Sequence, residues 1–319
     1  MLPHFLRSIS STQKHKTSAA LNAVFEHNPP LDTAHAHWWP PKIQNTPPKC
    51  VLLFVPGNPG LIEFYTPFLE ALYNRDTSGR LAILAHAHIG HTPGVGSAKS
   101  DHGLTSQVQS AIEAFDALQS AYPADTKIVL IGHSVGSWIC SQVLKARTEN
   151  VHAVFLLFPT LSYIGDTPNG RRLWRIFTPT GRWIVSKLGH LARLVPVQVL
   201  GRLFPEWPSS QLEVLKDLVG DPRSIVAALT MASDEMHAIK ELDVALFESC
   251  KGKLRFYYAE RDDWVGEERE RVLKVLHTSE SGIPVEVVHD EHGIPHAFCI
   301  NHSEQLAVQC SKWLEGLNM

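Results

Sequence analysis

The sequence predicts an α/β fold in which a mostly parallel sheet is flanked by helices and interrupted by a helical insertion. Apolar runs suited to strands buried on both faces occur at 50–55, 81–87, 127–131 and 151–158, and segments with helical spacing lie between them. Strands that alternate with helices favour a parallel sheet with right-handed crossovers. After Pro159 the alternation stops, and it resumes only at residues 253–259. The 319 residues, 44% of them hydrophobic and 19% charged, suit one large globular domain with an insertion.

These patterns divide the chain into three parts. Residues 1–44 are expected to form an N-terminal arm, partly disordered, followed by a Pro-rich approach to the first strand. Residues 45–160 and 250–319 are expected to form the α/β core, and residues 161–249 are expected to form a helical insertion that acts as a lid. The last expected elements are a strand at 284–288 and a helix at 303–317.

The first strand, Cys50–Val55, ends in the turn sequence Pro56-Gly57-Asn58-Pro59-Gly60. An apolar helix through Phe64, Tyr65, Phe68 and Leu72 is expected after it. The second strand, 81–87, precedes a helix predicted at 105–121 by its apolar spacing. The third strand begins at Lys127 and leads into the motif that organises the chain.

That motif is Gly132-His133-Ser134-Val135-Gly136, placed between a buried strand and a helix that starts at once. The pattern G-x-S-x-G in this context is typical of a nucleophile elbow, in which a strained turn exposes the serine hydroxyl. Gly132 and Gly136 let strand and helix approach each other closely. The bare pattern arises by chance in roughly one chain in ten of this length, so its partners decide the interpretation.

A serine nucleophile needs an imidazole to accept its proton and a carboxylate to orient that imidazole. The strand at 253–259 runs into Asp262 and Asp263, which places a carboxylate where an acid is needed. The loop after the last strand offers His289, His292 and His296. His296 is favoured because apolar residues flank it on both sides. We therefore predict Ser134, Asp262 and His296 as the catalytic residues, in the chain order of α/β-hydrolases.

An oxyanion hole requires two backbone amides close to the nucleophile. Val135 follows the nucleophile directly and is expected to supply the first. The second is expected from the turn at 56–60. Pro59 has no N–H, so Asn58 is the predicted donor.

Several further segments, together with the motifs above, make the chain resemble the lipid droplet-associated hydrolase family. They are FVPGNPGLIEFYTPFL (54–69), GHSVGS (132–137), LLFPT (156–160), TPNGR (167–171), DEMHAIKELD (234–243), FYYAERDDW (256–264) and IPHAF (294–298). The resemblance implies a serine hydrolase of α/β fold at lipid droplets or the endoplasmic reticulum membrane, with sterol esters as the proposed substrate class. It places nucleophile, acid and base on Ser134, Asp262 and His296. Ala259 departs from the expected Gly, and the adjacent Asp263 leaves the choice of acid open.

The insertion has an unusual charge pattern, because no acidic residue lies between Asp166 and Glu206. Basic residues alternate there with Trp and Leu, as in helices that lie on a lipid surface. We therefore predict that residues 171–205 contact a lipid droplet or membrane surface. A lid that simply packs on the core is the alternative. No run of 18 apolar residues predicts a membrane-spanning helix.

No cofactor, metal or nucleic acid is expected as a partner. The net charge of −3 gives no basic surface for nucleic acid. His86, His88 and His91 have spacing that a metal site could use, but no acidic residue or Cys joins them before Asp101. The five cysteines are scattered and odd in number, which favours free thiols in a reducing compartment.

The sequence thus predicts a cytosol-facing serine hydrolase of hydrophobic lipid esters, with sterol esters preferred. Two alternatives use the same fold. One is a lipid droplet surface protein that acts by binding, with weak or vestigial hydrolase activity. The other is an acyltransferase or thioesterase, since fold alone does not determine function.

Overall fold

The computed structural model describes residues 1–9, 18–96, 101–278, 285–290 and 293–317. Over these residues the chain forms a nine-stranded sheet in the order β1-β2-β3-β5-β4-β6-β7-β8-β9. Strands β4 to β9 run parallel to one another, whereas β1, β2 and β3 form an antiparallel edge in which β3 also pairs antiparallel with β5. The predicted α/β fold with a mostly parallel sheet is confirmed.

The strands have the following bounds: β1 Leu6–Ser8, β2 Leu21–Phe25, β3 Ala34–Trp39, β4 Cys50–Val55, β5 Leu81–His86, β6 Lys127–His133, β7 Val151–Leu157, β8 Leu254–Tyr258 and β9 Glu286–His289. The α-helices are α1 Thr66–Arg75, α2 Leu104–Ala121, α3 Val135–Ala146, α4 Pro168–Phe177, α5 Pro179–Ala192, α6 Val197–Leu203, α7 Ser209–Gly220, α8 Pro222–Ala238, α9 Val244–Ser249, α10 Glu268–Thr278 and α11 Ser303–Gly316. Short 3₁₀ helices lie at Ile62–Tyr65, Ile164–Asp166 and Lys251–Lys253.

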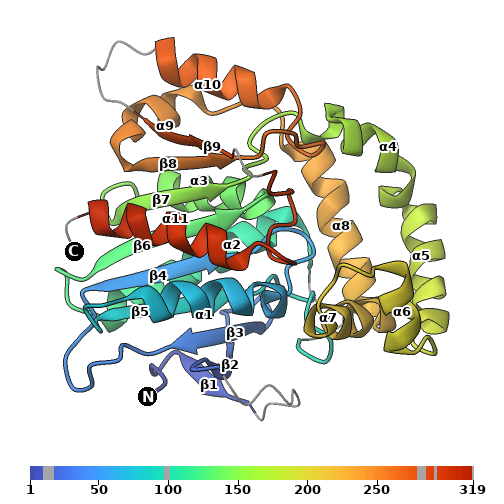
Figure 1. The fold of residues 1–319 in the computed structure, drawn as a ribbon, viewed down its shortest axis with the longest axis horizontal. Coiled ribbons are helices and arrows are strands. Elements are labelled where there is room, and N and C mark those ends of the chain that lie inside the picture. The colour runs from blue at the N-terminus through green and yellow to red at the C-terminus, as the bar shows by residue number, and fades with distance from the viewer. Residues whose placement is uncertain (10–17, 97–100, 279–284, 291–292, 318–319) are drawn as a thin grey trace.

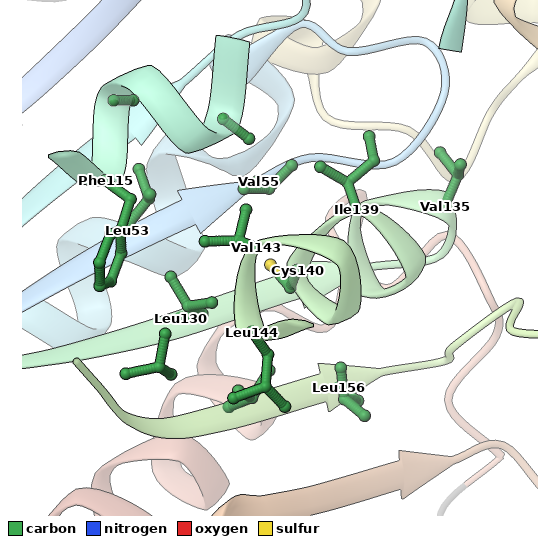
Figure 2. Close-up of a cluster of buried hydrophobic side chains, with 14 of the residues drawn as sticks. Leu53, Val55, Phe115, Leu130, Val135, Ile139, Cys140, Val143, Leu144 and Leu156 are labelled. Atoms are coloured by element: carbon green, nitrogen blue, oxygen red, sulfur yellow. The ribbon is translucent and has the colours of Figure 1, made fainter. Parts of the chain in front are cut away.

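The sheet separates two hydrophobic cores. Alternate residues of β4 point to opposite faces, so that Leu53 belongs to one core and Leu52 to the other. Helices α1 and α11 cover the face of Leu52, and α2, α3, α9 and α10 cover the opposite face. Figure 2 shows the latter core, where Ile139 and Val143 of α3 pack over Val55 of β4 and Leu130 of β6.

The N-terminal segment differs from its prediction. The expected arm at 1–44 contributes β1, β2 and β3, and β3 is buried along its whole length. Residues 34–39 read Ala-His-Ala-His-Trp-Trp, which has no run of aliphatic residues. β3 nevertheless pairs with β5, its residues Trp38 and Trp39 lying opposite Leu84 and Ile83. The arm prediction is therefore wrong for these strands.

The insertion after β7 forms helices α4 to α8, which lie together beyond the carboxyl ends of the parallel strands (Figure 1). In the part of the chain that the structure describes, no helix has both the length and the apolar character needed to cross a bilayer. All five cysteines are free, as the sequence favours, and all five are buried.

Candidate active site

Ser134 lies at the sharp turn between β6 and α3. Its backbone has φ 54° and ψ −124°, a strained conformation for a residue with a side chain. A Cβ on Gly132 would lie 2.4 Å from the carbonyl oxygen of Gly136, and one on Gly136 would lie 2.3 Å from that of Val55. Both positions therefore require glycine, and the turn has the geometry of a nucleophile elbow.

Ser134, His296 and Asp262 form one hydrogen-bonded series. His296 Nε2 lies 2.9 Å from Ser134 Oγ, and His296 Nδ1 lies 2.7 Å from Asp262 Oδ2. A carboxylate can only accept, so Nδ1 carries the proton and Nε2 is left to accept from the serine hydroxyl. This is the tautomer that a general base requires.

The turn after β8 aims Asp262, and not Asp263, at the imidazole. Asp262 Oδ1 accepts from the backbone amides of Trp264 and Val265, at 2.9 and 3.3 Å, which leaves Oδ2 for His296. The backbone carbonyl of Asp263 accepts from Asn169 at the start of α4. The Asp262 side chain is only 6% exposed, so few waters compete for its bond to His296.

A buried carboxylate, Asp290, bonds to the loop that carries His296. It accepts from the hydroxyl of Tyr257 at 2.9 Å and from the backbone amide of Ile294. Of the other histidines considered, His289 is exposed at the end of β9, and His292 lies outside the described residues. The contact of Asp290 with Tyr257 was not predicted, because only the pairing of β8 with β9 brings the two residues together.

The loop after β4 passes directly beside the nucleophile. A Cβ on Gly57 would lie 3.1 Å from Ser134 Cβ. Asn58, the predicted second oxyanion donor, follows Gly57 and precedes a cis peptide bond to Pro59. Val135 is the first residue of α3, where backbone amides have no partner within the helix. Both amides remain the predicted oxyanion donors.

The side chain of Asn58 ties this loop to α8. Its amide donates to the carbonyl oxygen of Ala228 at 2.9 Å and to Glu235 Oε1 at 2.7 Å. Burial raises the pKa of Glu235 to about 8, with a further contribution from Asp234, although the hydrogen bond from Asn58 opposes the shift. Glu235 is therefore largely protonated at neutral pH.

A second buried contact fixes α7. Gln211 Nε2 donates to the carbonyl oxygens of Phe64, 3.1 Å away, and Cys299, 3.0 Å away. Phe64 precedes α1, and Cys299 follows His296 in the loop before α11. Gln211 therefore joins α7 to both of these segments. Neither bond was predicted, since both join segments far apart in the chain, although Glu235 lies in the family segment 234–243.

The geometry can be set beside known proteins. Residues 48–299 match the family described as lipid-droplet associated hydrolase. The chain belongs to this family. The human lipid droplet-associated hydrolase is 30% identical over 287 residues, which cover 82% of this chain and 83% of the human protein. The mouse relative is 29% identical over 289 residues, covering 84% and 86%.

At the level of the fold, this member of the lipid-droplet associated hydrolase family is also similar to solved structures. A 2-hydroxy-6-oxo-6-phenylhexa-2,4-dienoate hydrolase from Rhodococcus superposes with a TM-score of 0.64 at 13% identity, covering 93% of this chain and 99% of that one. A structure described with the carboxylesterases of Nitrososphaera gargenis superposes with a TM-score of 0.63 at 14% identity. The superposition covers 92% of this chain and 98% of that one. The fold is that of an α/β-hydrolase.

Helices α4 to α6 of this family member present a surface rich in exposed apolar side chains. We call it the α4–α6 surface. Its large exposed apolar residues are Trp174, Trp183, Ile184, Leu188, Leu191, Leu194, Val199, Leu203 and Phe204. Leu194 is 79% exposed, and α6 buries none of its residues. An unburied apolar face of this kind marks an interaction site.

The histidines at 86, 88 and 91 are buried beside the loop that carries Asn58. His86 Nε2 lies 3.0 Å from His27 Nε2, and the backbone amide of Gly60 donates to His91 Nδ1. Burial lowers the pKa of His88 to about 3. Among the described residues, no group of three or more His, Cys, Asp or Glu side chains could hold a metal ion. His91 thus supports the loop that carries Asn58, whereas His86 bonds to His27.

Proposed function

We propose that this protein is a serine hydrolase that cleaves carboxylic esters of hydrophobic lipids at the surface of lipid droplets. The observation that carries the proposal is the unbroken series from Ser134 Oγ through His296 to Asp262, with both bonds below 3 Å. Sterol esters are the preferred class, on the resemblance to the family. The names of the relatives support the droplet as the location.

In the first half-reaction, Ser134 Oγ attacks the ester carbonyl carbon as its proton passes to His296 Nε2. The carbonyl electron pair moves onto the oxygen, where the amides of Val135 and Asn58 hold it. Collapse of this intermediate breaks the bond to the alcohol oxygen, which takes the proton from His296. The products are an acyl-enzyme and the free alcohol.

In the second half-reaction, His296 removes a proton from water, whose oxygen attacks the acyl carbon. A second tetrahedral intermediate collapses, Ser134 Oγ regains its proton from His296, and a fatty acid leaves. Asp262 keeps Nδ1 protonated throughout and stabilises the charge of the imidazolium. These steps need no group beyond the chain's own residues and water.

The α4–α6 surface supports the docking step. Its Trp and Leu side chains suit the acyl region of a lipid monolayer, and its Arg and Lys residues suit phosphate head groups. Anchors at Asn58 and Gln211 hold α8 and α7 against the core, whereas α4 to α6 lie farther out. We propose that lipid enters past α4–α6 while α7 and α8 stay in place. The endoplasmic reticulum membrane remains a prediction from the resemblance.

Labelling by a fluorophosphonate probe tests the enzymatic proposal, because the probe reacts only with an activated serine. We expect wild-type protein to be labelled and the Ser134→Ala variant to remain unlabelled while both stay folded. Fatty acid release from sterol ester, acylglycerol and retinyl ester emulsions would then identify the substrate. A folded wild-type protein that takes no label would refute the enzymatic proposal.

The second candidate is a droplet-binding protein with weak or vestigial activity. The exposed α4–α6 surface favours it independently of the catalytic residues. It predicts full droplet binding by Ser134→Ala and no label on the wild type. The proposed hydrolase predicts the same binding but a labelled wild type.

Flotation with artificial droplets tests the docking surface. The Leu188→Asp/Leu191→Asp variant should float at least about tenfold less, because each leucine withdrawn from lipid loses roughly 2 kcal/mol. Val244→Asp is the matched control, since Val244 is 40% exposed on α9, outside the α4–α6 surface. Equal flotation of all three proteins would contradict docking through α4–α6.

A further inference from the structure

Two buried side chains outside the proposed catalytic residues connect three loops of the site. Tyr65 lies in the 3₁₀ turn before α1, and His133 directly precedes Ser134. The backbone amide of Gly57 donates to the Tyr65 hydroxyl at 3.1 Å, and that hydroxyl lies 2.8 Å from His133 Nδ1. His133 Nε2 lies 2.9 Å from the backbone carbonyl oxygen of His296.

The direction of each bond follows from the chemistry of its partners. A carbonyl oxygen only accepts, so His133 Nε2 must carry a proton. Burial holds the pKa of His133 well below its usual value, and the neighbouring His296 lowers it further, so the ring is neutral and Nδ1 is an acceptor. The Tyr65 hydroxyl therefore donates to Nδ1, and its lone pair accepts from Gly57 N–H.

Aromatic rings enclose the series and keep water from replacing its bonds. Tyr65 and His133 are 3% and 4% exposed. The rings of Phe158 and Phe298 stand edge-on to His133, with centroids 5.9 and 5.1 Å away. In such surroundings a satisfied hydrogen bond is strong, and an unpaired polar group is costly.

We propose that Tyr65 and His133 are positioning residues. They hold the loop at 56–60, the turn at Ser134 and the loop that carries His296 in one arrangement. The proposal rests on the proposed function of Ser134. Two consecutive residues hold His296. Ser134 bonds to the ring of His296, and His133 bonds to the main-chain carbonyl of His296. With the main chain fixed, only the side-chain torsions of His296 remain free. Tyr65 sets the position of Gly57, next to the predicted oxyanion donor Asn58.

Loss of these bonds should lower the rate of acylation without weakening the binding of the acyl chain. Displacements of about 1 Å between reacting groups lower rates by roughly a hundredfold, whereas a loosened loop leaves the lipid-facing surface unchanged. The series also joins three segments of the family resemblance, FVPGNPGLIEFYTPFL, GHSVGS and IPHAF, in one connected unit.

The test compares Tyr65→Phe, His133→Leu and His133→Gln with the wild type, and uses Tyr73→Phe as the matched control. Tyr73 is a buried tyrosine whose hydroxyl donates to Pro40, away from the site. Fluorophosphonate labelling is measured against probe concentration. We expect Tyr65→Phe and His133→Leu to lower the saturating rate about tenfold or more, with an unchanged half-saturating concentration. His133→Gln should recover part of the loss, because its amide can still donate to His296.

Melting temperatures separate positioning from general damage. Tyr65→Phe should unfold within a few degrees of Tyr73→Phe, so that the rate loss belongs to the site. Wild-type labelling rates in Tyr65→Phe and His133→Leu would overturn the proposal. So would a rate loss that Tyr73→Phe shares.

Nitrogen NMR of histidine-labelled protein at pH 7 gives a readout that does not need activity. We expect His133 to carry its proton on Nε2, and Tyr65→Phe to shift the ring signals of His296, which Tyr73→Phe leaves in place. A proton on Nδ1 of His133, or unmoved His296 signals, would overturn the positioning role even if Ser134 is reactive. An unlabelled wild type with the expected spectra would refute the proposed function and leave the bonded series established.

Discussion

Asn58 and Glu235 are 177 residues apart in the chain and joined by a hydrogen bond of 2.7 Å. One belongs to the loop beside the nucleophile and the other to a helix of the insertion. Because Asn58 also donates to Ala228, the loop is bonded to α8 at two positions about two helical turns apart. An opening that lifted α8 would separate the Asn58 amide from the buried carboxyl group of Glu235, which disfavours motion of this helix.

The stability of the protein should fall as pH rises from about 4.5 to 8, through Glu235. Its pKa is about 8 in the folded protein against 4.5 for an ordinary Glu, so the native state binds the proton more tightly than the unfolded chain. Between these values the native state keeps a proton that the unfolded state releases, and unfolding becomes easier with rising pH. Glu235→Gln keeps the acceptor for Asn58 and removes the titration. At pH 8.5 it should be more stable than the wild type by roughly 3 to 5 kcal/mol, and near pH 4 about equal.

Urea unfolding at several pH values measures this difference. Glu248→Gln is the matched control, because Glu248 is an exposed carboxyl on α9 and should give a nearly constant offset. If the gap between wild type and Glu235→Gln does not widen with pH, Glu235 is not protonated in the native state.

Gln211→Ala should weaken the attachment of α7. The substitution removes both bonds from Gln211, although the carbonyl of Cys299 keeps a longer bond of 3.4 Å from Ser303 Oγ. We expect the free energy of unfolding to fall by roughly 1 to 3 kcal/mol and proteolysis within the insertion to speed up. Gln119→Ala, on the exposed face of α2, is the control. A loss no larger than that of the control would show that α7 is not held by these bonds.

The parallel part of the sheet was predictable, and its antiparallel edge was not. Leu81–His86 and Val151–Leu157 each carry a single histidine among residues that are otherwise apolar, and such segments fit a strand that is covered on both faces. Strand β3 carries His35 and His37 in the core, and a local pattern treats histidine as polar. Oε1 of Glu63 lies 3.2 Å from Nδ1 of His35. Burial alone would raise the pKa of Glu63, but His35 and His37 lower it to about 2. This long-range compensation leaves no mark on the sequence of β3.

In the candidate site, too, some residues were predictable from the sequence and others were not. Ser134, Asp262 and His296 follow from chain order, because the carboxyl ends of parallel strands meet at one edge of the sheet. Tyr65, His133 and Asp290 were not singled out, since their partners lie on other strands and loops. Their contacts depend on the pairing of β4 with β6 and on the register between β6, β7, β8 and β9, which only the folded chain fixes.

Replacing Asp262 should inactivate the protein, whereas replacing Asp263 should not. Asp262→Asn keeps the size of the side chain but offers His296 Nδ1 a weaker acceptor or a competing donor, so the imidazole loses the tautomer that accepts from Ser134. We expect hydrolysis of a soluble p-nitrophenyl ester and probe labelling to fall by about a thousandfold or more. Asp263→Asn serves as the control and should stay within about threefold of wild type, since its backbone makes the contact to Asn169. The opposite order of losses would assign the acid to Asp263.

Binding to a lipid monolayer should change the environment of two exposed tryptophans. Trp174 on α4 and Trp183 on α5 are 55% and 61% exposed, whereas Trp38 and Trp39 are fully buried. Transfer of the exposed indoles from water to the interface should shift the emission to shorter wavelength and admit quenching by brominated acyl chains. The difference between wild type and Trp174→Phe/Trp183→Phe isolates their signal from that of the other tryptophans. A double variant that shows the same shift and quenching as the wild type would place the lipid contact elsewhere on the molecule.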